Sequence, residues 1–253
     1  MLAVERRKKI IEMLKEKKSV MVTELSRLFE VTEETIRRDL EKLENEGHLK
    51  RTYGGAVLNE STNIELPFNI RVGKNPEGKK AIGIKAAEFI EDGDSIILDS
   101  SSTALQVAKN IKNKQRITVI TNSEKVMIEL SNAPDCKVIS TGGTLKTNSM
   151  SLVGHWAEKA IQNYNVDKAI ISCAGASLTK GFTDSNELEA EVKKAMLKSA
   201  EKVFLVVDNT KFDKVSFTRI ADFKSIDYIF TDKKLSQEWE KELEENKIKL
   251  IYA

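Results

Sequence analysis

Apolar residues are spaced differently in the two parts of the chain. In residues 1–57 they recur every three or four positions, which predicts amphipathic helices. The first helix spans residues 3–17, a second follows Val20, and a third begins after Thr32. From residue 78 onward, short continuous apolar runs alternate with amphipathic stretches. This alternation predicts an α/β domain whose largely parallel sheet is covered by helices on both faces.

The third predicted helix has a side chain pattern suited to nucleic acid. Thr32 is a typical N-cap, because its hydroxyl can accept from a free amide of the first turn. Ile36, Leu40 and Leu43 form the apolar face. Two residues separate this helix from the preceding one, so the pair predicts a helix-turn-helix. The remaining side chains can reach phosphates and base edges: Thr35, Arg37, Arg38 and Lys42.

A short basic hairpin is expected after this helix. Gly47 should end the helix, and residues 50–55 then form a tight turn carrying Lys50 and Arg51. The paired arginines alone would also fit an ordinary solvated helix face. Together with the cap, the preceding helix and the basic wing, they favour DNA binding.

Net charge does not mark the chain as a nucleic-acid binder. It has 41 Lys+Arg against 39 Asp+Glu, a formal net charge of +2. Any positive electrostatic field must therefore be local. Its sources are the Lys and Arg side chains at residues 6–9, in the third helix and in the wing. We expect a small basic patch and an operator affinity that falls as salt rises.

A change in composition marks the domain boundary. Residues 58–77 contain two of the three prolines, with four asparagines and one glycine, which is typical of linkers and turns. The segment Leu66–Phe68 is less polar than a free tether and should pack on a domain or on a partner subunit. We expect a DNA-binding domain at 1–57, a linker at 58–77 and an effector domain at 78–253.

Polar loops follow three predicted strands of the second domain. In such sheets, ligands bind beyond the carboxyl ends of the strands. Residues 99–103 open a helix, where hydroxyls and free amides can hold an anion. Residues 121–123 and 141–144 follow the next two strands. Each loop alone can be explained as a helix cap, but three together favour a phosphate-bearing small molecule. No G-x-G-x-x-G follows a strand, which argues against a dinucleotide.

The first domain resembles the DeoR family of bacterial transcriptional regulators, whose signature has the form TIRRDL…LE..G.L.R..GGA. The chain matches it at Thr35–Leu40, Leu43–Glu44, Gly47, Leu49, Arg51 and Gly54–Ala56. The resemblance implies a winged helix-turn-helix whose helix enters the major groove while the wing lies along the backbone. The DNA contacts that we expect are Thr32, Thr35, Arg37, Arg38, Lys42, Lys50 and Arg51.

The resemblance continues through the second domain. The family's sensor domain is similar in fold to ribose-5-phosphate isomerase and glucosamine-6-phosphate deaminase, and it binds phosphorylated sugars or related metabolites. Its D-[SA]-G-[ST]-T loop matches residues 99–103, with Ser101 in place of the usual glycine. The resemblance places Lys211 on the effector phosphate, and Asp184 and Glu187 are candidates to face sugar hydroxyls or to be solvated or capping acids. The expected effector site is Asp99, Ser100, Ser101, Ser102, Thr103, Asn122, Ser123, Gly142, Gly143, Asp184, Glu187 and Lys211.

We expect a repressor of a sugar-metabolism operon that a phosphorylated sugar or related metabolite releases from double-stranded operator DNA. Two alternatives are a sugar-phosphate isomerase and a DNA-binding protein without an effector. An isomerase needs a positioned base, but residues 172–175 lack the acids that related isomerases carry there. Because one winged domain reads a short site, we expect at least a homodimer.

Cofactors, metals and membranes are not expected. Cys136 and Cys173 lie in apolar, strand-like segments, which favours buried thiols over a disulfide framework. His48 and His155 lie far apart in the sequence and suggest no metal site. No apolar run approaches the ~20 residues that span a bilayer, and no signal peptide is evident. We therefore expect a cytoplasmic protein.

Overall fold

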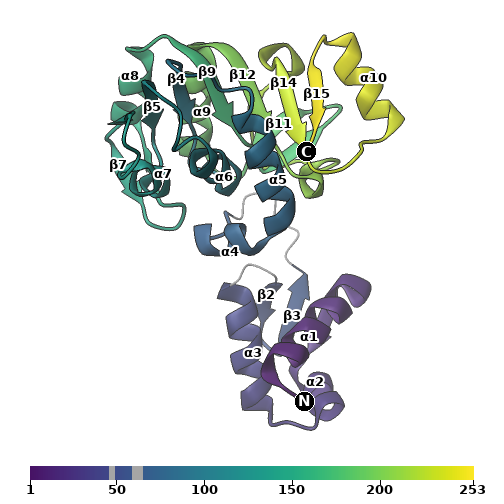
Figure 1. Cartoon of the computed structure of the whole chain (residues 1–253). Helices are drawn as coiled ribbons and strands as arrows, with labels where there is room; N and C mark the ends of the chain where they lie inside the picture. Colours follow the sequence, from purple (N-terminus) through teal and green to yellow (C-terminus); the bar gives the residue numbers. More distant parts are fainter. Residues whose placement is uncertain (46–48, 59–64) are drawn as a thin grey trace. The chain divides into compact units, whose positions relative to one another are not determined.

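The computed structural model describes residues 1–45, 49–58 and 65–253, so Gly47, the expected end of the third helix, lies outside the described residues. The chain forms two compact units, residues 1–67 and 68–253 (Figure 1). Residues 68–77, which the sequence analysis assigned to the linker, belong to the second unit. In the described ranges, no helix is long and apolar enough to cross a membrane.

The first unit is a helical core with a small antiparallel sheet. Its described helices are α1 (Ala3–Lys17), α2 (Val22–Phe29) and α3 (Glu33–Asn45). Its described strands, in the order β1-β3-β2, are β1 (Ser19–Met21), β2 (Leu49–Thr52) and β3 (Gly55–Leu58). Ile10, Leu25 and Ile36 belong to a common core, so the three predicted helices and the hairpin are confirmed. The short strand β1 was not predicted. The expected apolar stripe of the first helix would include Val4, but that side chain is 71% exposed.

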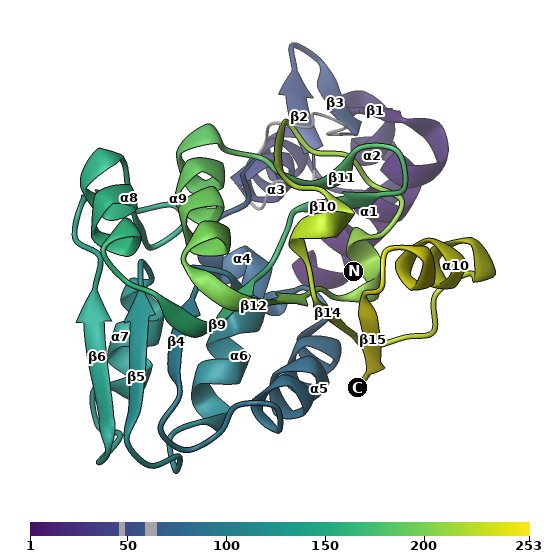
Figure 2. The same cartoon turned by 90° about the horizontal axis from the view of Figure 1, so that it is seen from above.

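A parallel sheet forms the centre of the second unit. Within residues 68–253, which are all described, seven strands pair in the order β15-β14-β12-β9-β4-β5-β6 (Figure 2). Every neighbouring pair is parallel, as predicted. The strands are β4 (Ser95–Leu98), β5 (Ile117–Thr121), β6 (Cys136–Ser140), β9 (Val166–Ile171), β12 (Ala200–Val206), β14 (Tyr228–Thr231) and β15 (Lys249–Tyr252).

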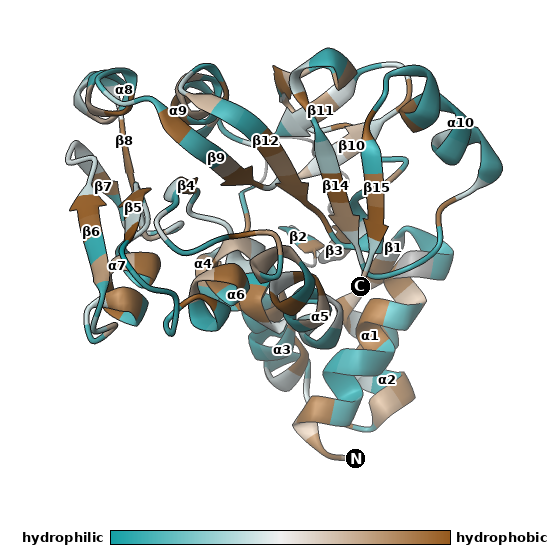
Figure 3. Ribbon diagram, turned by 45° about the horizontal axis from the view of Figure 1, so that its top comes forward, coloured by the Kyte–Doolittle hydropathy of each residue, from teal (hydrophilic) through white to brown (hydrophobic). Residues whose placement is uncertain are grey.

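Helices cover both faces of this sheet, because alternate strand residues point to opposite sides. Ile96 and Leu98 pack in one core with Ile82 and Leu105, whereas Ile97 belongs to the core on the other face. Figure 3 shows the apolar central strands between more polar helices. The first core is covered by α4 (Phe68–Gly73), α5 (Pro76–Ala87), α6 (Ser102–Asn110) and α7 (Glu124–Leu130). The second is covered by α8 (His155–Gln162), α9 (Glu187–Lys198) and α10 (Gln237–Glu245).

Short antiparallel elements complete the second unit and were not predicted. A hairpin of β7 (Thr144–Lys146) and β8 (Ser151–Val153) follows the edge strand β6. A separate sheet consists of β10 (Gly175–Ser177), β11 (Gly181–Asp184) and β13 (Thr218–Ala221). Two 3₁₀ turns are η1 (Asn209–Lys211) and η2 (Phe223–Ser225). These segments of three or four residues are too short to show a clear period of two in the sequence.

The strand order reverses between β4 and β9. From β4 the chain builds β5 and β6 toward one edge, and from β9 it builds β12, β14 and β15 toward the other. Such a reversal leaves a crevice beyond the carboxyl ends of the two central strands. The loops that follow β4 and β9 begin at Asp99 and Ser172, so a ligand site is expected there.

Candidate DNA-binding and effector sites

The turn between α2 and α3 has the geometry of a helix-turn-helix. Glu30 adopts a left-handed conformation, with φ 54°, and its amide donates to the carbonyl of Ser26. The Thr35 amide donates to Thr32 Oγ1 over 3.2 Å, so Thr32 caps α3 as predicted. The hydroxyl oxygens of Thr32 and Thr35 are 2.9 Å apart. The N-terminal turn of α3 is therefore held rigidly by its own side chains.

Two exposed arginines on α3 are held by acids one turn earlier. Arg37 Nη2 lies 2.6 Å from Glu33 Oε2, and the Arg37 side chain is 54% exposed. Arg38 Nε lies 3.3 Å from Glu34 Oε1, and the Arg38 side chain is 78% exposed. Exposed pairs of this kind contribute little to stability, so a phosphate can replace the carboxylate. Lys42 is also exposed.

The basic residues near the N-terminus do not all contribute to this surface. Arg6 is only 6% exposed, and its Nε lies 2.5 Å from Oδ2 of the buried Asp39. Arg7 Nη1 lies 3.2 Å from the other oxygen of the same carboxylate. The expectation that all bases at 6–9 add to one basic patch is therefore wrong for Arg6, whose charge is buried against Asp39.

The wing is a tight hairpin with its basic residues exposed. Thr52 pairs with Gly55 across the turn, and Lys50 and Arg51 are exposed on β2. Arg51 Nε lies 2.7 Å from Glu44 Oε2, which fixes the wing to the end of α3. The Arg51 backbone amide also donates to Glu44, and this hydrogen bond is the main cause that lowers the pKa of Glu44.

The loop after β4 joins an anchoring carboxylate to free donors. Asp99 is fully buried, and its oxygens accept from the amides of Ser101, at 3.0 Å, and Ser172, at 2.8 Å. Ser101 Oγ accepts from the Ala104 amide and caps α6. Asp99 and Ser101 thus position the loop. The hydroxyls of Ser102 and Thr103 make no hydrogen bond to the described residues, and their amides open α6, so they can bind an anion.

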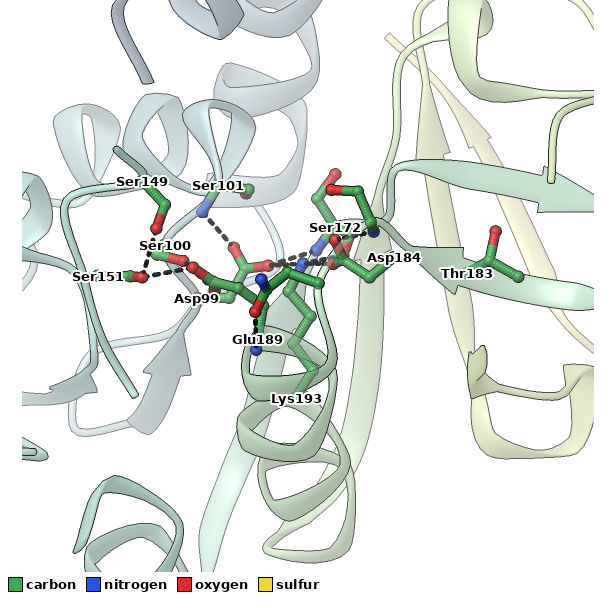
Figure 4. Close-up of polar contacts among 12 residues, drawn as sticks. Asp99, Ser100, Ser101, Ser149, Ser151, Ser172, Thr183, Asp184, Glu189 and Lys193 are labelled. Carbon is green, nitrogen blue, oxygen red and sulfur yellow. Dashed lines mark hydrogen bonds and ion pairs between the residues drawn. The ribbon is translucent and has the colours of Figure 1, made fainter. Parts of the chain in front are cut away.

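Helix α9 places a lysine and an acid at the switch point, the place between β4 and β9 where the strand order reverses (Figure 4). Lys193 Nζ lies 2.6 Å from Asp184 Oδ2 and 3.3 Å from Asp99 Oδ2, and donates to the Ser172 carbonyl over 2.8 Å. Burial by itself would lower the pKa of Lys193, but the carboxylates of Asp184, Asp99 and Glu189 raise it above its usual value. Lys193 therefore stays charged and connects the loops after β4 and β9.

Glu189 is the second inward-facing residue of α9. Its Oε2 accepts from Ser100 Oγ over 3.0 Å, and its Oε1 accepts from Ser151 Oγ. Ser149 Oγ lies 2.8 Å from Ser151 Oγ and extends this chain of hydroxyl groups. A buried carboxylate surrounded by hydroxyls can equally accept hydrogen bonds from the hydroxyls of a sugar.

The structure places the two acids named from sequence differently. Asp184 is buried and paired with Lys193, whereas Glu187 is exposed in the first turn of α9. Two polar residues of α9 hydrogen-bond to the loops after β4 and β9: Glu189 and Lys193, neither of which was among the effector residues expected from the sequence. Their spacing of four residues was a usable signal, because it places both on one face of a helix.

The other two polar loops have evident structural roles. Asn122 Nδ2 donates to the Leu152 carbonyl over 3.1 Å and fastens β8 to the loop after β5. Ser123 Oγ accepts from the Val126 amide and caps α7. Gly142 and Gly143 are exposed after the edge strand β6, and both have positive φ. A Cβ on Gly143 would lie 2.7 Å from the Val153 carbonyl, so glycine is required there.

Basic side chains gather near the end of β12. Lys211 is half-buried in η1, and its ammonium has no hydrogen bond or ion pair with the described residues. Lys79 of α5 is 4% exposed. Burial lowers the pKa of Lys79 to about 8; Asp208 opposes this shift, and Lys211, Arg71 and Lys74 add to it. An anion at this position would therefore meet a surplus of positive charge.

Cys173 follows β9 and is 5% exposed. Burial raises the pKa of its thiol to about 12, so the group is a packed neutral thiol rather than a nucleophile. Over the described ranges, no group of three or more His, Cys, Asp or Glu side chains is placed to hold a metal ion.

Comparisons with known proteins agree over nearly the whole chain. The DeoR-like helix-turn-helix domain matches residues 6–62, and the DeoR C terminal sensor domain matches residues 74–233. The uncharacterized HTH-type transcriptional regulator YulB of Bacillus subtilis is 43% identical over 99% of this chain and 96% of its own length. The putative aga operon transcriptional repressor of Escherichia coli O157:H7 is 34% identical over 90% of this chain and 86% of its own. The L-fucose operon activator of Haemophilus influenzae is 33% identical over 96% of this chain and 97% of its own length.

Among solved structures, ribose 5-phosphate isomerase A of Methanocaldococcus jannaschii covers 55% of this chain and 55% of its own, with 16% identity and a TM-score of 0.41. The full-length relatives, by contrast, are regulators that share the DNA-binding domain, so the isomerase alternative is set aside. The chain belongs to the DeoR family of transcriptional regulators, with an N-terminal helix-turn-helix that binds DNA and a C-terminal sensor domain.

Proposed function

We propose that this regulator represses an operon of sugar metabolism and that a phosphorylated sugar releases it from its operator. The effector proposal rests on one observation. Groups that suit a phosphate and groups that suit the hydroxyls of a sugar both occur at the switch point. The start of α6, with Lys211 near the end of β12, suits a phosphate. The chain of hydroxyls around Glu189 suits the hydroxyl groups of a sugar.

The DNA contacts are proposed on α3 and the wing. The proposed contacts on α3 and its N-cap are Thr32, Thr35, Arg37, Arg38 and Lys42. Those on the wing are Lys50 and Arg51. Guanidinium groups can bind guanine edges or phosphates, whereas hydroxyls suit phosphates and several base edges. We propose that the two α3 arginines supply most of the specificity, because the first-helix base Arg6 is buried against Asp39.

Repression, oligomerisation and location are part of the same proposal. One relative is named a repressor and another an activator, so the sign of regulation has to be measured.

We propose a dimer or larger homo-oligomer, since one winged domain reads a short site and two half-sites give useful affinity. We also propose that it acts in the cytoplasm, where a regulator of this kind reaches its DNA.

The test begins with a thermal-shift screen of the full-length protein against a panel of sugar phosphates. An operator is selected from a random-sequence DNA library, and its affinity is measured by fluorescence anisotropy with each stabilising compound. We expect a hit to weaken operator binding by about tenfold or more, a coupling free energy typical of allosteric regulators. A promoter–operator reporter then shows whether bound protein lowers or raises transcription.

Matched variants separate the two sites. Lys211→Ala should remove the response to the effector and leave operator binding intact, whereas the exposed Lys224→Ala should change neither. Arg38→Ala should weaken operator binding without altering stabilisation by the effector. If Lys211→Ala abolishes operator binding instead, the proposed effector site is wrong. If no sugar phosphate stabilises the protein or changes operator affinity, the effector proposal fails.

A further inference from the structure

We infer that Arg71 and Lys79 complete the anion subsite of the effector pocket, so that a bound phosphate fixes the segment leading to the DNA-binding unit. This inference rests on the proposed effector function and names two residues and a route of regulation for that site. Both residues lie in residues 68–79, which comprise α4 and the first turn of α5. Residues 68–77 of this segment fall in the linker expected from the sequence, whereas Lys79 falls in the expected effector domain.

Arg71 presents a buried donor without an acceptor. Its Nε is inaccessible to solvent and makes no hydrogen bond to the described residues. Its Nη2 lies 3.4 Å from the Ser149 carbonyl, and the guanidinium lies 5.4 Å from the ring centroid of Phe68. A buried N–H group without a partner is costly, and an anion would satisfy it with a charge-assisted hydrogen bond.

Lys79 is a buried cation with few compensating groups. Among the described residues, its ammonium donates to the Arg71 carbonyl alone, which leaves further N–H groups for a ligand. Burial disfavours its charged form, and Lys211 and Arg71 add repulsion that the single carboxylate of Asp208 opposes. A phosphate dianion placed among the three cations would reverse this imbalance.

The start of α5 is fixed to the turn that carries Lys211. Asn75 Nδ2 donates to Asp232 Oδ2 over 2.8 Å, and the Asn209 amide donates to the other oxygen over 2.7 Å. Asn209 and Lys211 belong to the same turn, η1. Gly78 packs so tightly against this junction that a Cβ would lie 2.3 Å from Asp232 Oδ2. Lys79, one residue after Gly78, is thereby held near the turn that carries Lys211, and the charge of Lys211 acts on it.

The same segment also contacts the hydroxyl side of the pocket. The Arg71 guanidinium reaches the Ser149 carbonyl, and the Ser149 hydroxyl lies next to Ser151, which donates to Glu189. The Phe68 amide donates to the Asn148 carbonyl over 2.8 Å. Segment 68–79 thus joins the two halves of the proposed pocket and continues directly into residue 67 of the first unit.

This arrangement supplies a physical basis for regulation. An effector shifts an equilibrium only if it binds two states unequally. Without an anion, the cations of the segment repel Lys211, and the segment is held by Asn75 and Phe68. With phosphate bound, Arg71 and Lys79 share a ligand with Lys211 and α6, so the segment is held more firmly. The effector therefore acts on the part of the sensor unit that adjoins the DNA-binding unit in the chain.

The test uses the full-length protein and inorganic phosphate as the probe, with titration followed by calorimetry. Arg71→Met and Lys79→Met should each weaken phosphate binding about tenfold or more, as expected for loss of a charge-assisted hydrogen bond. Lys80→Met is the matched control, because Lys80 is the exposed neighbour of Lys79 on α5. It should bind phosphate like the wild type. Circular dichroism confirms that each variant is folded.

A second measurement needs no variant. Hydrogen exchange of the wild-type protein should slow in residues 68–79 when phosphate is added. Absence of this protection overturns the inference, as does wild-type phosphate affinity in both Arg71→Met and Lys79→Met. If Lys211→Ala loses phosphate binding while these two variants keep it, the inference fails and the proposed function stands. If no sugar phosphate binds the wild type, the proposed function itself fails.

Discussion

Arg6 Nε lies 2.5 Å from Asp39 Oδ2, and both side chains are less than a tenth exposed. The pair joins α1 to the middle of α3, and Arg7 adds a second contact to the same carboxylate, at 3.2 Å. Asp39 lies between the arginine pair of α3 and its apolar residue Leu40. A residue inside the DNA-binding signature is thus a structural anchor, while its exposed neighbours remain available for DNA.

Asp39→Asn should destabilise the first unit. Removing the carboxylate leaves Arg6 buried without its counter-charge, and breaking such a pair costs about 3 kcal/mol or more. The free energy of unfolding is measured by urea titration of the full-length protein with circular dichroism. Glu41→Gln, two residues later and exposed, is the control and should change it by less than about 0.5 kcal/mol. Equal stability of the two variants would contradict the anchoring role of Asp39.

Gly55→Ala should disrupt the wing. A Cβ at this position would lie 2.0 Å from the Val20 carbonyl oxygen, so β1 and β3 would have to separate. Gly54→Ala is a close control, because its Cβ would meet the mobile end of Met21 at 3.3 Å. We expect a lower Tm and much weaker operator binding for Gly55→Ala, and near wild-type values for Gly54→Ala. A fully stable, DNA-binding Gly55→Ala protein would be inconsistent with this packing.

Operator affinity should fall steeply with salt although the net charge is only +2. Binding releases counterions from each contacted phosphate, so the logarithm of affinity decreases linearly with the logarithm of salt concentration. If Arg38 contacts a phosphate, Arg38→Ala should reduce that slope by about one. The exposed Lys109→Ala of α6 serves as control and should leave the slope unchanged. A flat salt dependence would argue against the basic patch on α3 and the wing.

Lys79 should make the free energy of unfolding depend on pH in the alkaline range. Burial lowers its folded-state pKa to about 8 from a reference value of 10.5. Between these values the unfolded chain binds more protons than the folded chain, so raising the pH stabilises the fold. Without phosphate, the unfolding free energy of the wild type should rise relative to that of Lys79→Met, by on the order of 3 kcal/mol over this window. A pH-independent difference between the two proteins would mean that Lys79 is not desolvated.

The variants Glu189→Gln and Glu187→Gln should show which of the two acids at the start of α9 binds the effector. Glu189 is buried and accepts from Ser100 and Ser151, whereas Glu187 is exposed. With an effector from the screen, Glu189→Gln should weaken binding by about tenfold, because an amide nitrogen cannot accept a hydroxyl hydrogen bond. Its affinity for inorganic phosphate should change far less. A larger effect from Glu187→Gln would support the assignment made from sequence.

Local periodicity and capping made several elements predictable. The spacing of Ile36, Leu40 and Leu43 predicted α3, and all three side chains are at most 1% exposed. Thr32 caps that helix, because an N-cap depends on residues within one turn. The continuous apolar runs predicted the central strands, since a parallel sheet buries both faces of each strand. These features involve interactions over a few residues, so their pattern is visible in the sequence.

The pairing of acidic and basic side chains could not be predicted, because it depends on long-range packing. Arg6 meets Asp39 from 33 positions away, and Glu189 meets Ser100 from 89 positions away. Whether an acid faces solvent or a crevice depends on how its helix packs, which is why Glu187 was chosen from sequence although Glu189 faces inward. The DNA-binding helix, the α/β class and the polar strand ends could all be predicted from local sequence patterns. Packing of distant segments decided which polar groups meet at the switch point, because burial and charge pairing are set by contacts that no local pattern encodes.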